Sequence, residues 1–235
     1  FKLILNVWEY HQAVVRGIRK KIDTTLFYRH GYRWVDGVIV ISSFLNSIAS
    51  KANPNIPIVQ IPALADFDEH SINATNKNTQ EKPYFLYCGG IDYKEAIDLV
   101  VTSFQLLTST QHKLILVVNG KEEKISRFQQ TIKKNQKTKA SIQVLYHLPY
   151  SELLQLFRGA SALLIPLMNK QSDVARFPQK LPEYLSTGRP VITTKVGDPG
   201  TILKHGQSAL FADGFDPKSF AVQMEFVQSN PQQAD

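Results

Sequence analysis

Short apolar runs alternate with amphipathic stretches along most of the chain. Aliphatic and β-branched runs bounded by Gly, Pro, Asn or Asp are typical of strands buried in a parallel sheet. The predicted strands are 2–8, 35–43, 56–61, 84–88, 114–118, 142–145, 162–165 and 191–194. The helical repeat predicts helices at 44–51, 95–107, 122–134, 151–158, 181–186 and 219–227, and the basic stretch through Arg33 is also compatible with a helix. This alternation predicts an α/β fold built from doubly wound, Rossmann-like parallel sheets.

The stretch between Asp66 and Lys82 is polar and rich in Asn and Thr, with almost no apolar residues. Such a stretch cannot bury enough surface to order itself, so we predict a linker at 69–82 that separates domains at 1–68 and 83–235. The chain begins in mid-pattern with Phe1 rather than Met. We therefore expect the first domain to be only partly present.

Composition is that of an ordinary folded protein, with 43% hydrophobic and 20% charged residues among 235. No apolar run approaches the roughly 18 to 20 residues that cross a bilayer. Cys88 is the one cysteine, so neither an internal disulfide nor a cysteine-based metal site can form. We predict a buried structural thiol there, because free cysteine is usually buried.

The net charge of +7 indicates affinity for an anion, such as a nucleotide phosphate, a lipid headgroup or a nucleic acid. The densest basic cluster comprises Lys133, Lys134, Lys137 and Lys139. A solvated helix end is the favoured interpretation of this cluster, and a membrane-surface patch is the alternative. Nucleic acid is the least favoured partner, since no zinc-finger spacing or RNA-binding aromatic motif accompanies the lysines.

Ligands of doubly wound sheets bind beyond the carboxyl ends of the strands. The stretches 89–94, 119–121, 147–149 and 166–181 follow predicted strands, so we expect them to line one edge. Glu9 and His11 end the first predicted strand in the same way. A histidine titrates near neutrality, so His11 is a candidate acceptor contact or proton shuttle.

The segment 175–191, ARFPQKLPEYLSTGRPV, carries the strongest motif. Pro178 and Pro182 predict the start of a helix, Gly188 its end, and Pro190 leads into a strand. A helix N-terminus at the carboxyl edge of a parallel sheet favours a phosphate. Glu183, about one turn in, suits the vicinal hydroxyls of a ribose, although for Glu183 taken alone a plain helix-surface carboxylate is the favoured interpretation.

The run from Glu183 to Ile192 resembles the end of the E-x7-E signature of family 4 retaining glycosyltransferases, also called glycosyl transferases group 1. Asp36–Ser42 is similar to the strand that closes the first domain of that family, and Tyr87–Lys94 to the glycine-containing opening of the second. The resemblance implies a GT-B fold. It makes 1–68 the end of an acceptor-side domain and 83–235 a nucleotide-sugar-binding domain without its final helix.

The resemblance also assigns candidate site residues. It implies that Glu183 binds the ribose and that Lys94, one residue early in the match, binds the diphosphate, with Gly90 at the usual arginine position. An exposed lysine at the start of a helix is an equally favoured interpretation of Lys94. The first signature glutamate is replaced by Ala175, so Arg176 and Lys180 are the candidate cations for the leaving diphosphate. The remaining candidate donor contacts are Gly89, His147, Phe177, Pro178 and Leu181.

The favoured function is sugar transfer with retention from a nucleoside diphosphate sugar to the hydroxyl of a saccharide or lipid-linked acceptor. Neither a metal nor another cofactor is expected, and the nucleoside diphosphate sugar is the expected donor substrate. Family context suggests a bacterial, cytoplasmic protein of surface polysaccharide or glycolipid synthesis, with peripheral contact to the inner membrane face. Because of Ala175, a catalytically weak nucleotide-binding or partner subunit stays open as the alternative. A GT-B epimerase is less favoured, and the absence of G-x-G-x-x-G argues against a nicotinamide enzyme.

Overall fold

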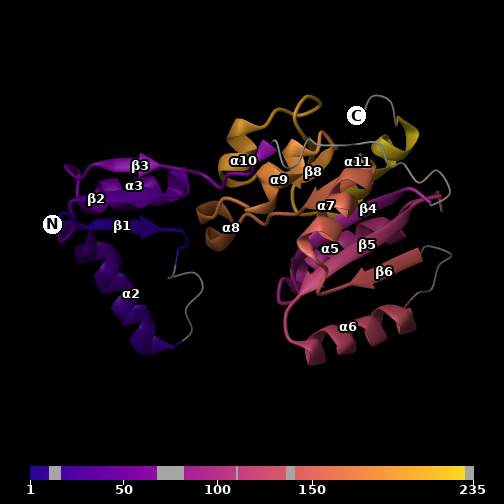
Figure 1. The fold of residues 1–235 in the computed structure, drawn as a ribbon, viewed down its shortest axis with the longest axis horizontal. Coiled ribbons are helices and arrows are strands. Elements are labelled where there is room, and N and C mark those ends of the chain that lie inside the picture. Colours follow the sequence, from indigo (N-terminus) through magenta and orange to yellow (C-terminus); the bar gives the residue numbers. More distant parts are fainter. Residues whose placement is uncertain (11–16, 68–81, 110, 136–140, 231–235) are drawn as a thin grey trace. The chain divides into compact units, whose positions relative to one another are not determined.

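The computed structural model describes residues 1–10, 17–67, 82–109, 111–135 and 141–230 (Figure 1). The chain forms two compact units. The first unit combines 1–64 with 168–179 and 196–202, and the second combines 65–167 with 180–195 and 203–235. Most of the predicted linker 69–82 lies outside the described residues, so it stays a prediction.

The second unit is built on a six-stranded sheet with the order β6-β5-β4-β7-β8-β9, in which all neighbouring strands are parallel. The strands are β4 (Tyr84–Gly90), β5 (Lys113–Asn119), β6 (Ser141–Leu145), β7 (Ala162–Ile165), β8 (Val191–Thr194) and β9 (Leu210–Ala212). The chain moves outward from β4 to β6 and then returns to β7 on the other side of β4. This reversal creates a switch point between β4 and β7, where open α/β sheets bind ligands.

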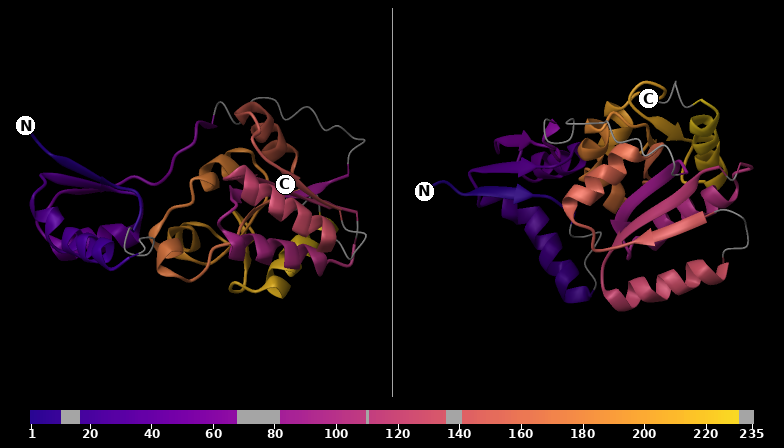
Figure 2. Two further views of the ribbon diagram at one scale, coloured as in Figure 1. Left: turned by 90° about the horizontal axis from the view of Figure 1, so that it is seen from below. Right: turned by 45° about the vertical axis from the view of Figure 1, so that its right-hand side comes forward.

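Helices cover both faces of this sheet (Figure 2). They are α5 (Lys94–Gln105), α6 (Glu122–Asn135), α7 (Tyr150–Gly159), α9 (Lys180–Ser186) and α11 (Pro217–Ser229). Helices α5, α6 and α11 share one apolar core with alternate strand residues such as Phe85 and Leu114. The intervening residues point to the opposite face, where the Tyr84 hydroxyl donates to the Leu156 carbonyl of α7.

The first unit contains a smaller parallel sheet with the order β1-β2-β3. Its elements are β1 (Ile4–Val7), α2 (Ile18–His30), the 3-10 turn η1 (Gly31–Arg33), β2 (Gly37–Val40), α3 (Ser43–Ala52), β3 (Ile58–Gln60), α8 (Gln171–Ala175) and α10 (Gly197–Ile202). Helix α3 packs against α8 and α10. Ser42 caps α3, because its hydroxyl accepts a hydrogen bond from the Leu45 N–H.

The predicted α/β fold with parallel sheets is confirmed, and each predicted strand and helix overlaps an observed one. Paired glycines usually mark a turn, so the sequence predicts one at Gly89-Gly90, and this prediction was wrong. Both glycines continue β4 and pair with Val118 and Asn119, and the turn comes at Ile91. The short elements α8, α10 and β9 were not predicted, because segments this brief carry too little periodicity.

None of the helices in the described parts of the chain is long and apolar enough to span a bilayer.

Candidate functional site

The carboxyl ends of β4 and β5 carry a group of lysines around one carboxylate. A hydrogen bond from Lys124 lowers the pKa of Asp92, and the charges of Lys124, Lys94 and Lys121 act in the same direction. Lys94 is the first residue of α5 and is exposed. The structure therefore places this predicted phosphate ligand in an electropositive region that faces solvent.

Lys94 also lines a groove of about 420 Å³ between α5 and α6. The other lining residues are Ile91, Asp92, Ile97, Asp98, Lys124, Arg127, Phe128 and Thr131. The charged lining residues are exposed, whereas Ile91 and Ile97 are buried. At Gly89, directly before this region, a Cβ atom would lie 2.5 Å from the Tyr87 hydroxyl, so packing alone favours glycine there.

Glu183 lies on α9, and its side chain is only 18% exposed. Lys180, one turn earlier, places its Nζ 2.8 Å from Glu183 Oε2, and the Tyr150 hydroxyl lies 3.5 Å from Oε1. A carboxylate held from one side by an ammonium group keeps further lone pairs for hydroxyl donors. Helix α9 has seven residues, so its macrodipole is small, and the Lys180 ammonium is the stronger local positive charge.

Gly188 ends the turn that follows α9, as predicted. Its φ of 68° lies in the left-handed region, and its N–H donates to the Leu185 carbonyl at 3.1 Å. Glycine adopts this conformation without the steric penalty of a Cβ atom. The turn thereby brings the chain from α9 into β8 within four residues, from Thr187 to Pro190.

The thiol of Cys88 lies close enough to Lys180 and Glu183 for their charges to affect its titration. Burial raises the pKa of Cys88 to about 11, Lys180 lowers it and Glu183 raises it further. Burial likewise raises the pKa of the neighbouring Tyr184 well above its usual value. Cys88 therefore stays a neutral, buried thiol near pH 7, which confirms the prediction of a structural cysteine.

His147 follows β6 on the same carboxyl edge of the sheet as Lys94, with β5 between β6 and β4. Its φ of 53° is left-handed, a conformation that His adopts more readily than most residues. The imidazole is exposed and packs edge-on against the Tyr146 ring at 5.3 Å. Its predicted contact with the donor stays a prediction.

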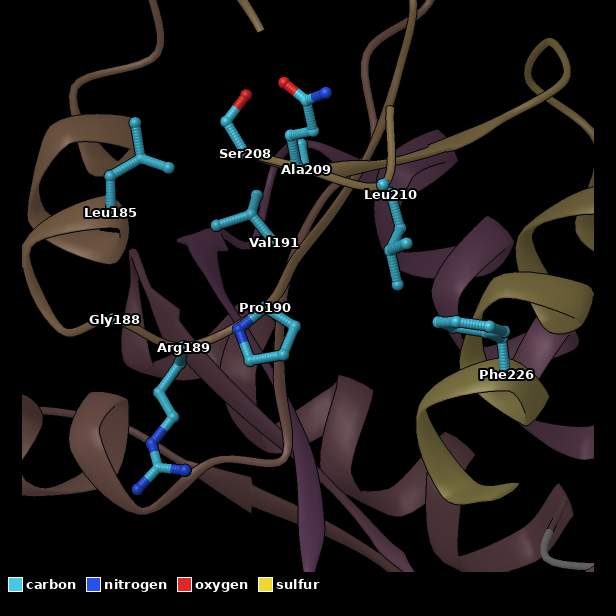
Figure 3. A pocket seen from close by; sticks show the side chains of 11 residues that line it. Leu185, Gly188, Arg189, Pro190, Val191, Ser208, Ala209, Leu210 and Phe226 are labelled. Carbon is cyan, nitrogen blue, oxygen red and sulfur yellow. The ribbon is translucent and has the colours of Figure 1, made fainter. Parts of the chain in front are cut away.

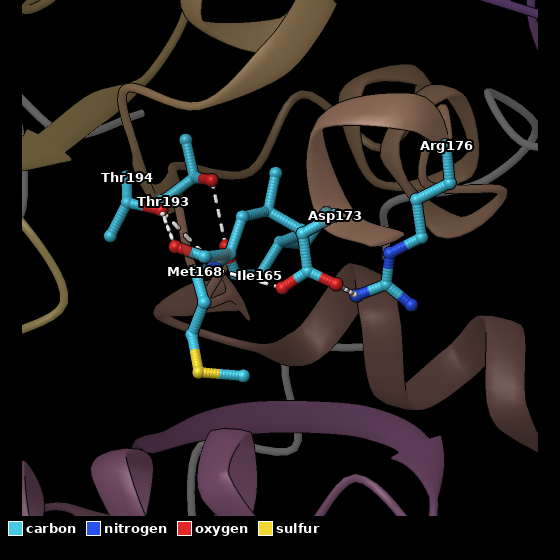
Figure 4. A network of polar contacts seen from close by, with 7 residues as sticks. Ile165, Met168, Asp173, Arg176, Thr193 and Thr194 are labelled. Atoms are coloured by element: carbon cyan, nitrogen blue, oxygen red, sulfur yellow. Dashed lines mark hydrogen bonds and ion pairs between the residues drawn. The ribbon is translucent and has the colours of Figure 1, made fainter. Parts of the chain in front are cut away.

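Arg176 belongs to the first unit and is paired within it (Figure 4). Its Nη2 lies 3.1 Å from Asp173 Oδ1, while Asp173 Oδ2 accepts the Met168 N–H at 2.8 Å. The Asp173 side chain is only 4% exposed, against 27% for Arg176. Asp173 therefore fixes both the loop that begins at Met168 and the guanidinium of Arg176.

Ala175, at the position of the first signature glutamate, is fully buried. Its carbonyl accepts a hydrogen bond from the Ser42 hydroxyl. Phe177 is buried at 9% exposure and Pro178 is half-buried. In the second unit Leu181 is 2% exposed, so packing in the core occupies much of its side chain.

Asp198 is a second buried carboxylate that the sequence analysis missed. It accepts hydrogen bonds from the Ser43 N–H at 2.9 Å and from Gln60 Nε2 at 3.0 Å. These bonds join α10 to α3 and β3 within the first unit. In the sequence, the Gly197-Asp198 pair after a strand could have indicated a role for Asp198. For Asp173, the corresponding signal was its three-residue spacing from Arg176.

Two threonines of β8 hold the end of β7 in the second unit (Figure 4). The Thr193 hydroxyl donates to the Ile165 carbonyl at 2.7 Å, and the Thr194 hydroxyl donates to the Leu167 carbonyl and accepts the Leu167 N–H. These side-chain bonds extend the pairing of β7 and β8 beyond the strand ends. They position the loop that leaves β7 at the carboxyl edge.

His11 lies outside the described residues, so its predicted role stays a prediction. Glu9, which the structure does describe, is exposed, and its carbonyl accepts a hydrogen bond from the Tyr28 hydroxyl. Among the described residues, no three His, Cys, Asp or Glu side chains are grouped to hold a metal ion.

A second cavity of about 420 Å³ lies at the amino ends of β8 and β9 (Figure 3). Its walls include Leu185, Val191, Leu210 and Phe226. The predicted donor ligands of the second unit lie at the carboxyl ends or on α9. This cavity therefore does not belong to the candidate site.

Residues 68–235 match the family described as Glycosyl transferases group 1. The fold is similar to that of sucrose-phosphate synthase from Thermosynechococcus elongatus, with a TM-score of 0.80 and 16% identity over 100% of this chain and 60% of that one. It is also similar to Anabaena HepE in complex with UDP-glucose, with a TM-score of 0.72 and 14% identity over 99% of this chain and 64% of that one.

A third similar structure is the pneumococcal O-GlcNAc transferase GtfA in complex with UDP and GlcNAc. The TM-score is 0.60, with 18% identity over 88% of this chain and 41% of that one. The chain thus spans less than two thirds of each of these proteins, and the likeness shows a GT-B fold. No curated protein sequence is significantly similar to this one.

Proposed function

The chain belongs to the glycosyl transferases group 1 family, and from this premise we propose that its protein transfers a sugar from a nucleoside diphosphate sugar to an acceptor hydroxyl with retention. The observation that carries the proposal is Glu183. This carboxylate is sheltered but reachable on α9, its Oε2 is bound by Lys180, and it lies within the matched region.

Glu183 would bind the two ribose hydroxyls of the donor. Vicinal hydroxyls donate naturally to the two oxygens of one carboxylate, and hydrogen bonds to a charged acceptor are the stronger ones. Lys180 fixes the carboxylate before the donor arrives, so less conformational freedom is lost on binding. Because HepE and GtfA are solved with UDP or UDP-glucose, a UDP-sugar is the first donor to test.

Lys94 and Lys180, both in the second unit, would supply positive charge for the diphosphate leaving group. In the proposed reaction, the bond between the anomeric carbon and the phosphate oxygen breaks while the acceptor oxygen bonds to the same face of that carbon. The acceptor proton passes to the departing diphosphate. Fixed cations stabilise the charge that develops on the leaving oxygen, and this stabilisation requires no metal ion.

The proposed setting is the synthesis of a bacterial surface polysaccharide or glycolipid. The acceptor would be a saccharide or a lipid-linked glycan reached from the cytoplasmic side, with peripheral contact to the inner membrane. The basic net charge of +7 supports contact with an anionic lipid surface.

The test uses the complete gene product with UDP-, GDP- and ADP-sugars and a panel of saccharide and lipid-linked acceptors. Release of nucleoside diphosphate measures turnover, and the proton coupling at the new anomeric centre reports its configuration. We expect turnover with one donor class and a product that keeps the anomeric configuration of the donor. An inverted product would contradict retention.

The second candidate is a nucleotide-binding subunit of low catalytic power. Ala175 favours it, because this position is fully buried and carries no carboxylate to approach the donor sugar. Calorimetry on the same donor panel separates the two candidates. Nucleotide binding without release or transfer on any donor would contradict the transferase and support the subunit.

A further inference from the structure

The Tyr150 hydroxyl lies beside the carboxylate of Glu183, although the two residues belong to different helices. Tyr150 is the first residue of α7, and its hydroxyl donates a hydrogen bond to Glu183 Oε1 on α9. This bond is long, at 3.5 Å, against a usual O–H···O distance of about 2.8 Å. Lys180 binds the other oxygen, Oε2, at 2.8 Å. The carboxylate is therefore held tightly at Oε2 and loosely at Oε1.

Packing between α7 and α9 fixes this arrangement. The ring of Phe157 on α7 meets the ring of Tyr184 on α9 edge to face, with the ring centres 4.8 Å apart, and both side chains are fully buried. The Lys180 ammonium lies 5.7 Å from the centre of the Phe157 ring, within the range of a cation–π contact. All of these residues belong to the second unit. The position of Tyr150 relative to Glu183 is therefore set within that unit.

A ligand can reach both members of the pair, because Tyr150 is 43% exposed and the Glu183 side chain is 18% exposed. An ionised carboxylate only accepts hydrogen bonds, whereas a tyrosine hydroxyl can donate one. A sugar hydroxyl has one proton to donate and lone pairs that accept. Since the two protein oxygens are 3.5 Å apart, a third oxygen fits at ordinary hydrogen-bond distance from both. The pair thus offers one hydroxyl an acceptor for its proton and a donor for its oxygen.

We propose that Tyr150 binds the donor nucleotide by donating a hydrogen bond to the ribose hydroxyl whose proton Glu183 Oε1 accepts, and that it thereby selects ribonucleotides over deoxyribonucleotides. The long bond to Oε1 is exchanged for a shorter one to the ribose oxygen. A site built to bind a hydroxyl disfavours the analogue without it, because its polar groups are then left unpaired. The inference rests on the proposed nucleotide site at Glu183 and adds a specificity residue to it, 33 positions earlier in the chain.

The experiment is calorimetry of the complete gene product with UDP, 2′-deoxy-UDP and 3′-deoxy-UDP. Where the donor screen selects GDP or ADP, that nucleotide and its two deoxy forms replace the uridine set. The wild type should bind UDP about tenfold or more tightly than at least one deoxy form. Tyr150→Phe should weaken the binding of UDP about fivefold and change the binding of that deoxy form less than about twofold, because only the ribonucleotide loses a hydrogen bond.

Tyr146→Phe is the matched control. Tyr146 lies four residues earlier, is 42% exposed, and packs its ring against His147. Removal of its hydroxyl keeps that ring contact and should change all three Kd values less than about twofold. Both variants keep the aromatic ring at a partly exposed position, so scanning calorimetry should give a Tm within about 2 °C of the wild type.

Equal discrimination by the wild type and Tyr150→Phe would overturn the inference, and the nucleotide site would still stand if Glu183→Ala abolished UDP binding. A uniform loss of affinity for UDP and both deoxy forms in Tyr150→Phe would also overturn it, since that result would indicate a structural role only.

Failure of the sugar-transfer proposal is seen separately. The expected loss of discrimination in Tyr150→Phe, without turnover on any donor, would remove that proposal and leave the role of Tyr150 standing. A wild type that bound none of the nucleotides would overturn both.

Discussion

The segment 175–191 divides between the two units, and its two halves are built differently. In the second unit, 180–191 forms α9 and the start of β8 and presents Glu183, a carboxylate that a ligand can reach. In the first unit, 175–179 begins with the fully buried Ala175, and its cation Arg176 is held by the buried Asp173.

The two halves of the segment therefore differ in what they can do. One presents a carboxylate to a ligand, and the other packs into the core of the first unit. The half with Glu183 keeps the chemistry suited to a ribose. The other half begins with a small core residue, Ala175, and its Arg176 is paired with the buried Asp173. Four substitutions test this comparison.

Glu183→Ala should have the largest effect. Loss of charge-assisted hydrogen bonds to two ribose hydroxyls should cost about 3 kcal/mol, which lowers kcat/KM roughly 100-fold or more. Steady-state release of nucleoside diphosphate measures the change. Glu152→Ala is the control, because Glu152 is an exposed first-turn glutamate of α7 and should retain turnover within about twofold. Equal activity of the two variants would remove Glu183 from the site.

Ala175→Glu should destabilise the fold rather than restore the signature. The position is fully buried, and its backbone is held by Ser42, so a carboxylate there would be desolvated without a partner. We expect a loss of about 3 kcal/mol, or a Tm lower by roughly 6 to 12 °C. Scanning calorimetry measures it, with Ala52→Glu at the half-buried end of α3 as the control. An unchanged Tm together with faster transfer would show that the site still accommodates the first glutamate.

Arg176→Ala should reduce the free energy of unfolding by about 2 kcal/mol, because it leaves the buried Asp173 carboxylate without its cation. Arg127→Ala removes an exposed pair with Glu123, whose side chains are 77% and 75% exposed, and should cost about 0.5 kcal/mol or less. Urea denaturation of both variants measures the difference. Equal losses would show that burial of Asp173 contributes nothing to the pair.

Lys180→Met should have the smallest effect of the four. The variant keeps the aliphatic stem but removes the ammonium that fixes Glu183, so the Kd for UDP should rise about fivefold, equivalent to about 1 kcal/mol. Lys218→Met, at an exposed position in α11, is the control for loss of one charge. If calorimetry gives the same Kd for both variants, Lys180 neither orients Glu183 nor contacts phosphate.

Much of the second unit could be predicted because its strands are apolar on both faces and its helices are long enough to show a period. Gly188 was found from spacing, since a helix end followed by a buried strand favours glycine, whereas Glu183 was singled out by the resemblance to the family signature. The short α8 and α10 could not be predicted, because they are stabilised by contacts with α3 and not by their own periodicity.

The buried carboxylates show most clearly which features could not be predicted from the sequence. Asp173 and Asp198 resemble ordinary polar loop residues in the sequence. The partners of Asp173, Met168 and Arg176, are its neighbours in the chain, whereas only folding brings Asp198 to Ser43 and Gln60. Their burial depends on partners up to 155 positions away, as for the Ser43 bond to Asp198.

The sequence by itself determined the α/β class, the parallel arrangement and the helix end at Gly188, because hydrophobic period and helix-end chemistry are local properties. Only the tertiary structure decided that Ala175 is a core residue and that Asp173 and Asp198 are buried. Burial and ion pairing are set by what packs against a residue, and that information lies elsewhere in the chain.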